Sequence, residues 1–273
     1  MVNRTTFMIQ RQLKEEIKRR LYKGKAIIVL GPRQTGKTTL LQTIASAEGE
    51  YLLLNCDDSV TRELLEKTSL QVIKQLIGSK RLVIIDEAQR VKNIGLALKL
   101  ITDQIKDVQI MVSGSSALEL ANEINEPLTG RKWEYMLYPI SWSEFCAHFG
   151  NLVGMQSLEQ RLVFGMYPEV INNVGNETDV LKQITDSYLY KDLLSYKGIR
   201  KPEILFKLLR ALSFQVGSEV SYNELANLLQ EGIEYGVKQY SYCICKSRDS
   251  YLAWLEDDYK RRLTTPLRQR FME

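Results

Sequence analysis

The chain has 273 residues, of which 44% are hydrophobic and 26% are charged. This composition suits one large or two modest packed domains and excludes a disordered chain. The 37 Lys and Arg residues against 33 Asp and Glu residues leave a net charge of +4, which permits a nucleic-acid partner without indicating one.

The cysteines and the apolar runs set further limits. Cys56, Cys146, Cys243 and Cys245 form neither a disulfide framework nor a zinc-binding spacing, so we expect reduced thiols. No apolar run approaches the roughly 20 residues that a bilayer span requires, and residues 1–6 lack the apolar core of a signal peptide. We therefore expect a cytoplasmic protein with no membrane partner.

The first segment, residues 1–24, is predicted to be an amphipathic N-terminal helix. Residues 4–23 carry apolar side chains at helical spacing, with basic side chains between them. The basic face consists of Arg11, Lys14, Lys18, Arg19 and Arg20. A solvated surface helix that leans on the core is one interpretation of this face, and contact with nucleic acid or membrane is the other.

The next stretch joins a short apolar run, residues 26–30, to a loop bounded by glycines. The spacing of Gly31, four residues and Gly36-Lys37-Thr38 fits the Walker A pattern, which predicts a strand, a phosphate-binding loop and a helix. The glycines bring backbone N–H groups close to phosphate oxygens at the positive end of the helix. Lys37 is expected to reach the β- and γ-phosphates, and the Thr38 hydroxyl to bind Mg²⁺. The expected nucleotide contacts are Gly31, Pro32, Arg33, Gln34, Thr35, Gly36, Lys37, Thr38 and Thr39.

An acidic pair follows at the end of a later apolar run. Residues 51–55 predict a buried second strand, and residues 57–59 suit a turn or a helix cap. A helical pattern then ends at Gly78, and residues 82–85 run directly into Asp86-Glu87. Apolar residues that lead into acids are typical of a central parallel strand with functional groups at its carboxyl end.

The acidic pair is the Walker B partner that the loop requires. Asp86 is expected to hold Mg²⁺ through water, and Glu87 to orient and polarise the attacking water. Alone the pattern is a weak signal, because many buried strands end in acids. Its position about fifty residues after a complete Walker A loop makes the signal specific.

The fourth predicted strand, residues 108–116, ends in small polar residues after a helical stretch at 91–105. In a parallel sheet this end lies beside the nucleotide site, so a hydroxyl of Ser113 or Ser115 could sense the γ-phosphate or position the attacking water. A serine cap at the start of the next helix explains the same residues, and the two roles are compatible.

A fifth strand is predicted at residues 133–137, after a loop at 127–131. A helix then begins at a cap, Ser141 or Ser143, with Glu144 early in its first turn. Strand and helix therefore alternate through five strands. This alternation predicts an α/β core over residues 25–150, with three layers and a mostly parallel five-stranded sheet.

Together these residues resemble prokaryotic, especially archaeal, P-loop ATPases of the AAA superfamily whose C-terminal half is a domain of unknown function. The matching stretches are residues 31–41, 86–90, 113–116, 128–131, 138–145 and 165–170. The resemblance implies ATP binding and Mg²⁺-dependent hydrolysis, with a sensor at the end of the fourth strand. It also implies an arginine finger near Arg131 that acts on a neighbour's nucleotide in a homo-oligomer. A structural salt bridge is the alternative role of Arg131.

Beyond Gly150 the pattern turns helical, and the resemblance implies a helical subdomain over residues 151–217. Residues 221–230 have the pattern of a capped helix that opens a winged-helix unit. Residues 218–273 are therefore expected to form an incomplete winged-helix-like segment with an atypical tail. From about residue 232 no regular period holds, and our hypothesis is a truncated or frame-shifted chain whose last residues, roughly forty, are not the family's sequence. A nucleic-acid-binding tail around residues 260–262 is the alternative.

The expected function is ATP binding with hydrolysis that drives or gates a conformational change. The alternative is a nucleotide-gated switch or adaptor with little turnover, which contacts DNA or protein through its C-terminal part. The preference for ATP over GTP depends on the resemblance and on the lack of an Asn-Lys-x-Asp-type guanine motif.

Overall fold

The structure is a computed structural model that describes residues 8–67, 69–114, 124, 127–185, 207–208, 211 and 221–229. The chain divides into two compact units, Met1–Leu181 and Lys182–Glu273. The first unit contains the predicted loop, the acidic pair and all five strands of the sheet.

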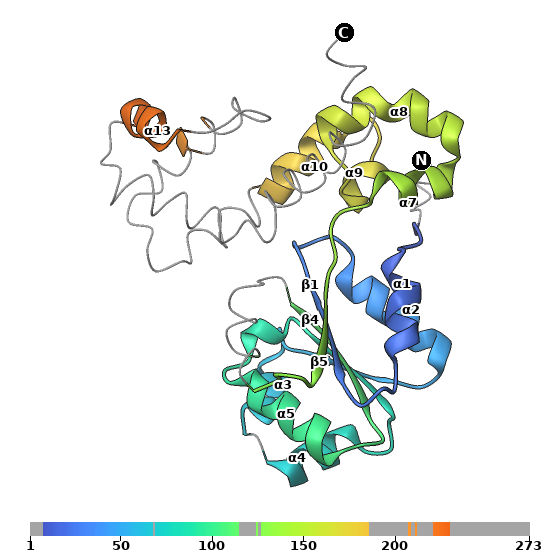
Figure 1. The fold of residues 1–273 in the computed structure, drawn as a ribbon, viewed down its shortest axis with the longest axis vertical. Helices are drawn as coiled ribbons and strands as arrows, with labels where there is room; N and C mark the ends of the chain where they lie inside the picture. Colours follow the sequence, from blue (N-terminus) through green and yellow to red (C-terminus); the bar gives the residue numbers. More distant parts are fainter. Residues whose placement is uncertain are drawn as a thin grey trace. The chain divides into compact units, whose positions relative to one another are not determined.

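The first unit is built on a five-stranded sheet in the order β2-β3-β4-β1-β5, and every strand pair is parallel (Figure 1). The strands are β1 (Ala26–Leu30), β2 (Leu52–Asn55), β3 (Leu82–Asp86), β4 (Gln109–Gly114) and β5 (Lys132–Met136). Strand β1 therefore lies between two neighbours, with Val29 opposite Ser113 of β4. The predicted sheet is confirmed.

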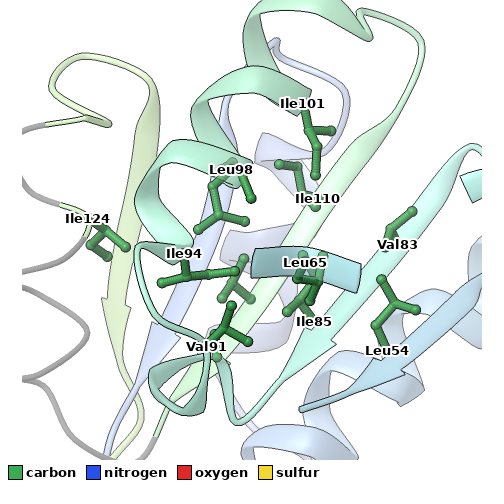
Figure 2. Close-up of a cluster of buried hydrophobic side chains, with 14 of the residues drawn as sticks. Leu54, Leu65, Val83, Ile85, Val91, Ile94, Leu98, Ile101, Ile110 and Ile124 are labelled. Atoms are coloured by element: carbon green, nitrogen blue, oxygen red, sulfur yellow. The ribbon is translucent and has the colours of Figure 1, made fainter. Parts of the chain in front are cut away.

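Helices cover both faces of the sheet, which confirms the three-layer arrangement (Figure 1). One face carries α3 (Ser59–Glu66), α4 (Leu70–Ile77) and α5 (Ile94–Gln104), and the other carries α1 (Leu13–Arg20) and α2 (Lys37–Glu48). Alternate side chains of β1 enter the two cores: Ile28 belongs to the core with α3, α4 and α5, whereas Ile27 and Val29 belong to the core with α1 and α2. Figure 2 shows the first of these cores, in which isoleucine, leucine and valine side chains of the helices meet those of β3 and β4.

Strand β2 differs from the expectation of a fully buried strand. It lies at the edge of the sheet, where Leu54 is 6% exposed but Leu53, on the opposite face, is 39% exposed. The expectation was wrong because a run of leucines does not reveal whether a helix covers both faces. The expected cap after this strand is confirmed, since the Asp58 carboxylate accepts a hydrogen bond from the Thr61 N–H at 2.9 Å.

The N-terminal helix is shorter than the expected span of residues 4–23. Helix α1 begins at Leu13, residues 8–12 are not helical, and residues 1–7 lie outside the described part. Ile17 and Leu21 are buried in the core shared with α2, while Arg19 is exposed, as expected of a helix that leans on the core. The segment is thus packed into the sheet unit.

Helices follow the sheet, as the sequence predicts. They are α7 (Trp142–Phe149), α8 (Asn151–Phe164), α9 (Pro168–Asn172) and α10 (Glu177–Ile184). Helix α7 begins at a capping box: the Ser141 hydroxyl accepts from the Glu144 N–H, and the Glu144 carboxylate accepts from the Ser141 N–H. A buried ion pair between Arg161 and Glu177, at 3.4 Å, joins α8 to the start of α10.

In the second unit the structure describes α13 (Tyr222–Leu229), which confirms the helix predicted at residues 221–230. Most of the predicted helical subdomain and winged-helix-like segment lies outside the described residues, so the limits 151–217 and 218–273 stay predictions. No helix in the described stretches is both long and apolar enough to cross a lipid bilayer.

Candidate functional site

The candidate site lies at the carboxyl ends of the central strands, where residues 31–36 join β1 to α2. Gly31 lies so close to the residue after β5 that a Cβ atom there would stand 2.2 Å from the carbonyl oxygen of Leu137. Gly36, directly before α2, has a φ of 89°, which L side chains rarely adopt. The two glycines are therefore required for different reasons, close approach at one end of the loop and backbone conformation at the other.

Lys37 is the first residue of α2, and its side chain is buried against the loop. Its ammonium group donates to the carbonyl oxygens of Gly31, at 2.9 Å, and Pro32, at 2.8 Å. The fully buried Thr35 hydroxyl donates to the same Pro32 oxygen at 2.8 Å. A buried cation at the N-terminus of a helix favours an anion of high charge density.

A buried carboxylate lies beside the loop. Asp86 ends β3 and is 8% exposed, and the Thr38 hydroxyl lies 2.9 Å from both of its carboxylate oxygens. The Ser113 hydroxyl, on the neighbouring strand β4, donates to one of the same oxygens. Among the residues that the structure describes, Asp86 forms no ion pair. Hydroxyl and carboxylate oxygens are the ligands that Mg²⁺ prefers, with water and phosphate oxygens in the remaining positions, so this donor set fits Mg²⁺.

Glu87 has an unusual backbone conformation. Its φ of 53° lies in the left-handed region, and it turns the chain from β3 into the short helix η1 (Ala88–Arg90). Its half-buried carboxylate accepts a hydrogen bond from the Gln89 side chain at 2.5 Å. The structure therefore places Glu87 at the same end of the sheet as the loop, with its side chain held by a polar partner.

Ser113 has a partner that the sequence did not indicate. Its side chain is fully buried, and its hydroxyl donates to Asp86. This contact makes Ser113 a support for the carboxylate, whereas its role as a γ-phosphate sensor stays a prediction. Ser115, the other candidate, and the helix that it was expected to cap lie outside the described residues.

Arg131 is not brought to this site. It directly precedes β5, and its carbonyl oxygen accepts from the N–H of Ala26, so it lies at the amino end of the sheet. The loop begins at the other end of β1. The Arg131 guanidinium forms a 2.7 Å ion pair with Asp103, which corresponds to the structural alternative, and its action on a neighbouring subunit stays a prediction.

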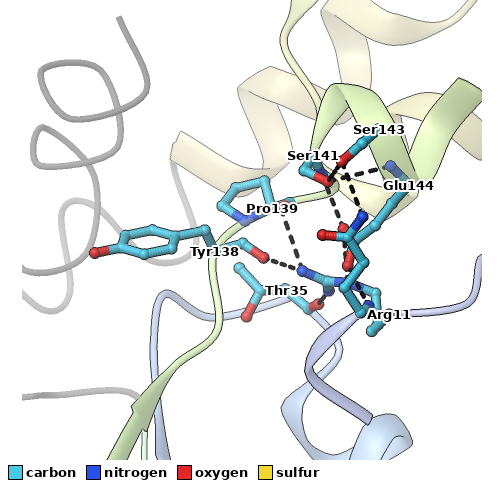
Figure 3. A network of polar contacts seen from close by, with 8 residues as sticks. Arg11, Thr35, Tyr138, Pro139, Ser141, Ser143 and Glu144 are labelled. Atoms are coloured by element: carbon cyan, nitrogen blue, oxygen red, sulfur yellow. Dashed lines mark hydrogen bonds and ion pairs between the residues drawn. The ribbon is translucent and has the colours of Figure 1, made fainter. Parts of the chain in front are cut away.

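The sequence pattern missed Arg11. This residue was assigned to a solvated basic face, but its side chain is only 10% exposed and forms an ion pair with the 6% exposed Glu144 (Figure 3). A helical period places Arg11 in line with Lys14 and Lys18, so no local signal distinguishes it from surface cations. The assignment was wrong because α1 begins only at Leu13, which leaves Arg11 on a non-helical segment that faces the loop.

The electrostatics of the site affect a nearby thiol. Cys56 directly follows β2, is fully buried, and donates its N–H to the Asp86 carbonyl oxygen at 3.0 Å. Burial, and then the negative charge of Asp86, raise the pKa of the Cys56 thiol to about 12. This thiol is therefore protonated over the physiological range.

Two family models match the chain. Residues 23–146 match a family described as an AAA domain, and residues 155–269 match a domain of unknown function. The second match extends to residue 269 and includes most of the atypical tail. The hypothesis that the last forty or so residues are not the family's sequence is therefore wrong, because frame-shifted residues would not follow the pattern of the domain.

Two curated relatives match most of the chain at low sequence identity. An uncharacterised protein of Methanocaldococcus jannaschii is 25% identical over 264 residues, which cover 90% of this chain and 58% of that protein. An uncharacterised protein of Haemophilus influenzae is 26% identical over 220 residues, which cover 74% of this chain and 54% of that protein. The chain thus spans little more than half the length of these relatives.

Among solved structures, a Walker-type ATPase of Pyrococcus abyssi superposes with a TM-score of 0.59 at 16% sequence identity. The superposition covers 88% of this chain and 90% of that one. At this identity the similarity shows a shared fold.

Proposed function

We propose that residues 23–146, which match a family described as an AAA domain, bind ATP with Mg²⁺ and hydrolyse it to ADP and phosphate. The observation that carries the proposal is the contact of the Thr38 hydroxyl with both carboxylate oxygens of Asp86, directly beside the loop. A turn with a structural role alone does not need a buried carboxylate that faces two hydroxyl groups.

The loop and the first turn of α2 would hold the phosphates. The backbone N–H groups of the loop supply hydrogen bonds, and Lys37 supplies a point charge for the β- and γ-phosphates. The hydrogen bonds from Lys37 to the carbonyl oxygens of Gly31 and Pro32 support this role, because they keep the ammonium group at the loop before a nucleotide binds. The proposed nucleotide contacts are Gly31, Pro32, Arg33, Gln34, Thr35, Gly36, Lys37, Thr38 and Thr39.

Thr38 and Asp86 would hold Mg²⁺, with Asp86 acting through water. Once bound, the ion neutralises charge that develops on the phosphate oxygens during transfer. Ser113 would keep the carboxylate oriented, since its hydroxyl donates to Asp86 from the neighbouring strand. The metal site would therefore depend on residues from α2, β3 and β4.

Glu87 would orient the attacking water and accept its proton. Its position directly after Asp86, on a left-handed backbone, supports the assignment because strained conformations persist where the surrounding structure fixes them. Gln89 holds the Glu87 carboxylate through a hydrogen bond. Catalysis of this kind is chiefly positioning and charge stabilisation, so the loss of Glu87 should affect turnover far more than binding.

A wider proposal concerns what ATP hydrolysis does for the protein, and it depends on the family resemblance. We propose that hydrolysis drives or gates a conformational change in the C-terminal part, through which the protein contacts another protein or DNA. A homo-oligomer in which Arg131 serves a neighbouring nucleotide belongs to the same proposal. Because ATP is supplied inside the cell, we propose a cytoplasmic place of action.

The direct test combines ATP binding with steady-state phosphate release, with and without Mg²⁺ and DNA. The wild type should bind ATP, and it should release phosphate only when Mg²⁺ is present. The turnover of Lys37→Ala should fall by about 10²-fold or more. Lys99→Ala, at an exposed position of α5, is the matched control and should behave as wild type. Binding without turnover would favour a nucleotide-gated switch, and a wild type that does not bind ATP would overturn the proposal.

A further inference from the structure

Arg11 connects three segments that are distant in sequence (Figure 3). Its guanidinium donates to the Thr35 carbonyl at 2.7 Å, to the Pro139 carbonyl at 3.2 Å and to the Glu144 carboxylate at 3.2 Å. It also donates to the carbonyl oxygen of Tyr138. Because Arg11 and Glu144 are both nearly buried, water cannot readily take over these bonds.

The loop end of this network acts on a peptide that belongs to the phosphate-binding loop. The Thr35 carbonyl is in the same peptide unit as the N–H of Gly36, and in a trans peptide these two groups point in opposite directions. A cation on the carbonyl side therefore leaves the N–H directed away from Arg11. It also polarises that N–H, since hydrogen bonds in a chain strengthen one another. Loop N–H groups are the donors that bind phosphate.

The other end of the network is the capping box of α7. The Glu144 carboxylate accepts from the Gln12 N–H at 2.7 Å and from the Ser141 N–H at 2.9 Å. The carboxylate that caps α7 is thus the one that orients Arg11. The position of the loop carbonyl and the start of α7 are therefore coupled through one side chain.

Only arginine has the geometry for this network. Its planar guanidinium presents five N–H donors in a fixed fork, and here the fork contacts four acceptors. Lysine keeps the charge but offers a single ammonium group, which cannot contact the Thr35 carbonyl and the Glu144 carboxylate with the same geometry. Arg11→Lys therefore keeps the positive charge but loses the planar arrangement of donors, so that the effects of charge and of hydrogen-bond geometry can be measured separately.

We propose that Arg11 is a positioning residue for the phosphate-binding loop, and that it joins the conformation of this loop to the N-terminus of α7. The inference depends on the proposed function in one respect, namely that the loop binds the phosphates of ATP. The connection between the loop and α7 can be measured without nucleotide.

The first measurement is amide hydrogen exchange of the nucleotide-free protein. Arg11→Lys should raise exchange about tenfold or more in peptides that cover residues 31–37 and 138–146, because bonds to a charged group in a buried network are lost. Arg19→Lys is the matched control, because Arg19 is exposed on α1. Hydrogen exchange in this variant should equal that of the wild type in both segments. Unchanged exchange in both segments of a folded Arg11→Lys variant would overturn the connection.

The second measurement is the affinity for ATP, compared with kcat. Arg11→Lys should raise Kd and KM for ATP about tenfold while kcat at saturation changes far less, because Arg11 does not contact the reacting atoms. Glu144→Gln should also raise Kd and KM for ATP. The double variant should add little to either single change, since the two residues act through one network. ATP binding at wild-type affinity in both single variants would overturn the positioning role.

The two proposals fail in different ways. A wild type that does not bind ATP would contradict the proposed function, and the exchange experiment would still decide whether Arg11 joins the loop to α7. If Arg11→Lys does not give the circular dichroism spectrum of the wild type, Glu144→Gln carries both measurements, because it removes the same ion pair from the other side.

Discussion

The hydroxyl of Thr38 lies 2.9 Å from each carboxylate oxygen of Asp86, although the two residues are 48 positions apart in the chain. Thr38 lies in the first turn of α2 and Asp86 ends β3, so only the parallel sheet brings them together. Their contact indicates that the loop and the acidic pair serve one site.

Removal of the Thr38 hydroxyl should weaken metal binding. Thr38→Val keeps a similar shape, and the Mg²⁺ concentration for half-maximal ATP hydrolysis should rise about tenfold or more, because one oxygen ligand is lost. Thr38→Ser retains the hydroxyl and should stay close to wild type. A Mg²⁺ titration of phosphate release checks both variants, and an unchanged requirement in Thr38→Val would remove Thr38 from the metal site.

Ser113→Ala should remove a hydrogen bond that supports the Asp86 carboxylate. The substitution leaves a buried carboxylate oxygen with one donor fewer, which should lower the free energy of unfolding by about 1–3 kcal/mol and weaken Mg²⁺ binding. Urea unfolding and the same Mg²⁺ titration measure the two effects. Ser46→Ala, at an exposed position of α2, serves as the control. Wild-type stability together with a wild-type Mg²⁺ requirement would show that the contact has no energetic role.

Gly31→Ala tests the close approach of the loop to Leu137, directly after β5. A methyl group at this position would meet the Leu137 carbonyl oxygen, so the loop or the strand has to move, and both stability and ATP affinity should fall. Gly130→Ala is the matched control, because Gly130 also has a positive φ, of 76°, but nothing lies within 4 Å of the place that a methyl group would take there. A comparison of thermal unfolding and ATP affinity separates backbone strain from the collision. Equal effects of the two substitutions would argue against the close approach.

Cys56 should resist alkylation in the folded protein. With its pKa raised to about 12, almost no thiolate forms at pH 8, whereas the thiol of the unfolded chain ionises near its ordinary pKa of 9.0. Iodoacetamide should therefore modify the Cys56 peptide in urea but not in buffer, as measured by mass spectrometry. Rapid modification in buffer would contradict the burial of this thiol.

The same thiol makes stability depend on pH. Above pH 9 the unfolded state releases the Cys56 proton while the folded state keeps it, so stability falls as pH rises from about 9 towards 12. Urea unfolding at pH 8 and pH 10 gives the free energy of unfolding at each pH. Between these two pH values it should fall less in Cys56→Ala than in the wild type, because the other groups that titrate in this range are the same in both proteins. An identical loss in the two proteins would show that Cys56 does not contribute.

Much of the fold follows from local patterns. Apolar runs that alternate with helical periods predict a mostly parallel sheet of five strands, and the Gly31 to Thr38 spacing together with Asp86 predicts which strand ends meet. The capping box at Ser141 is equally local, since its two partners are three residues apart. These features depend on neighbours in the chain or on the rules of parallel sheets.

The features that were missed depend on tertiary contacts. The exposure of Leu53 is decided by the place of β2 at the sheet edge, and the burial of Arg11 by partners more than a hundred residues away. Neither is visible in a hydrophobic period. The atypical tail is a related case, because its irregular pattern suggests foreign sequence although residues 155–269 match the domain of unknown function.

The most direct test of the central claim compares ATP binding and phosphate release in Glu87→Gln. The variant should bind ATP with an affinity within about twofold of the wild type, and its turnover should fall by about 10²–10⁴-fold, because only the group that activates water is lost. Glu63→Gln, at an exposed position of α3, should match the wild type in both measurements. Turnover of Glu87→Gln at the wild-type rate would contradict the assignment of this site as a hydrolytic one.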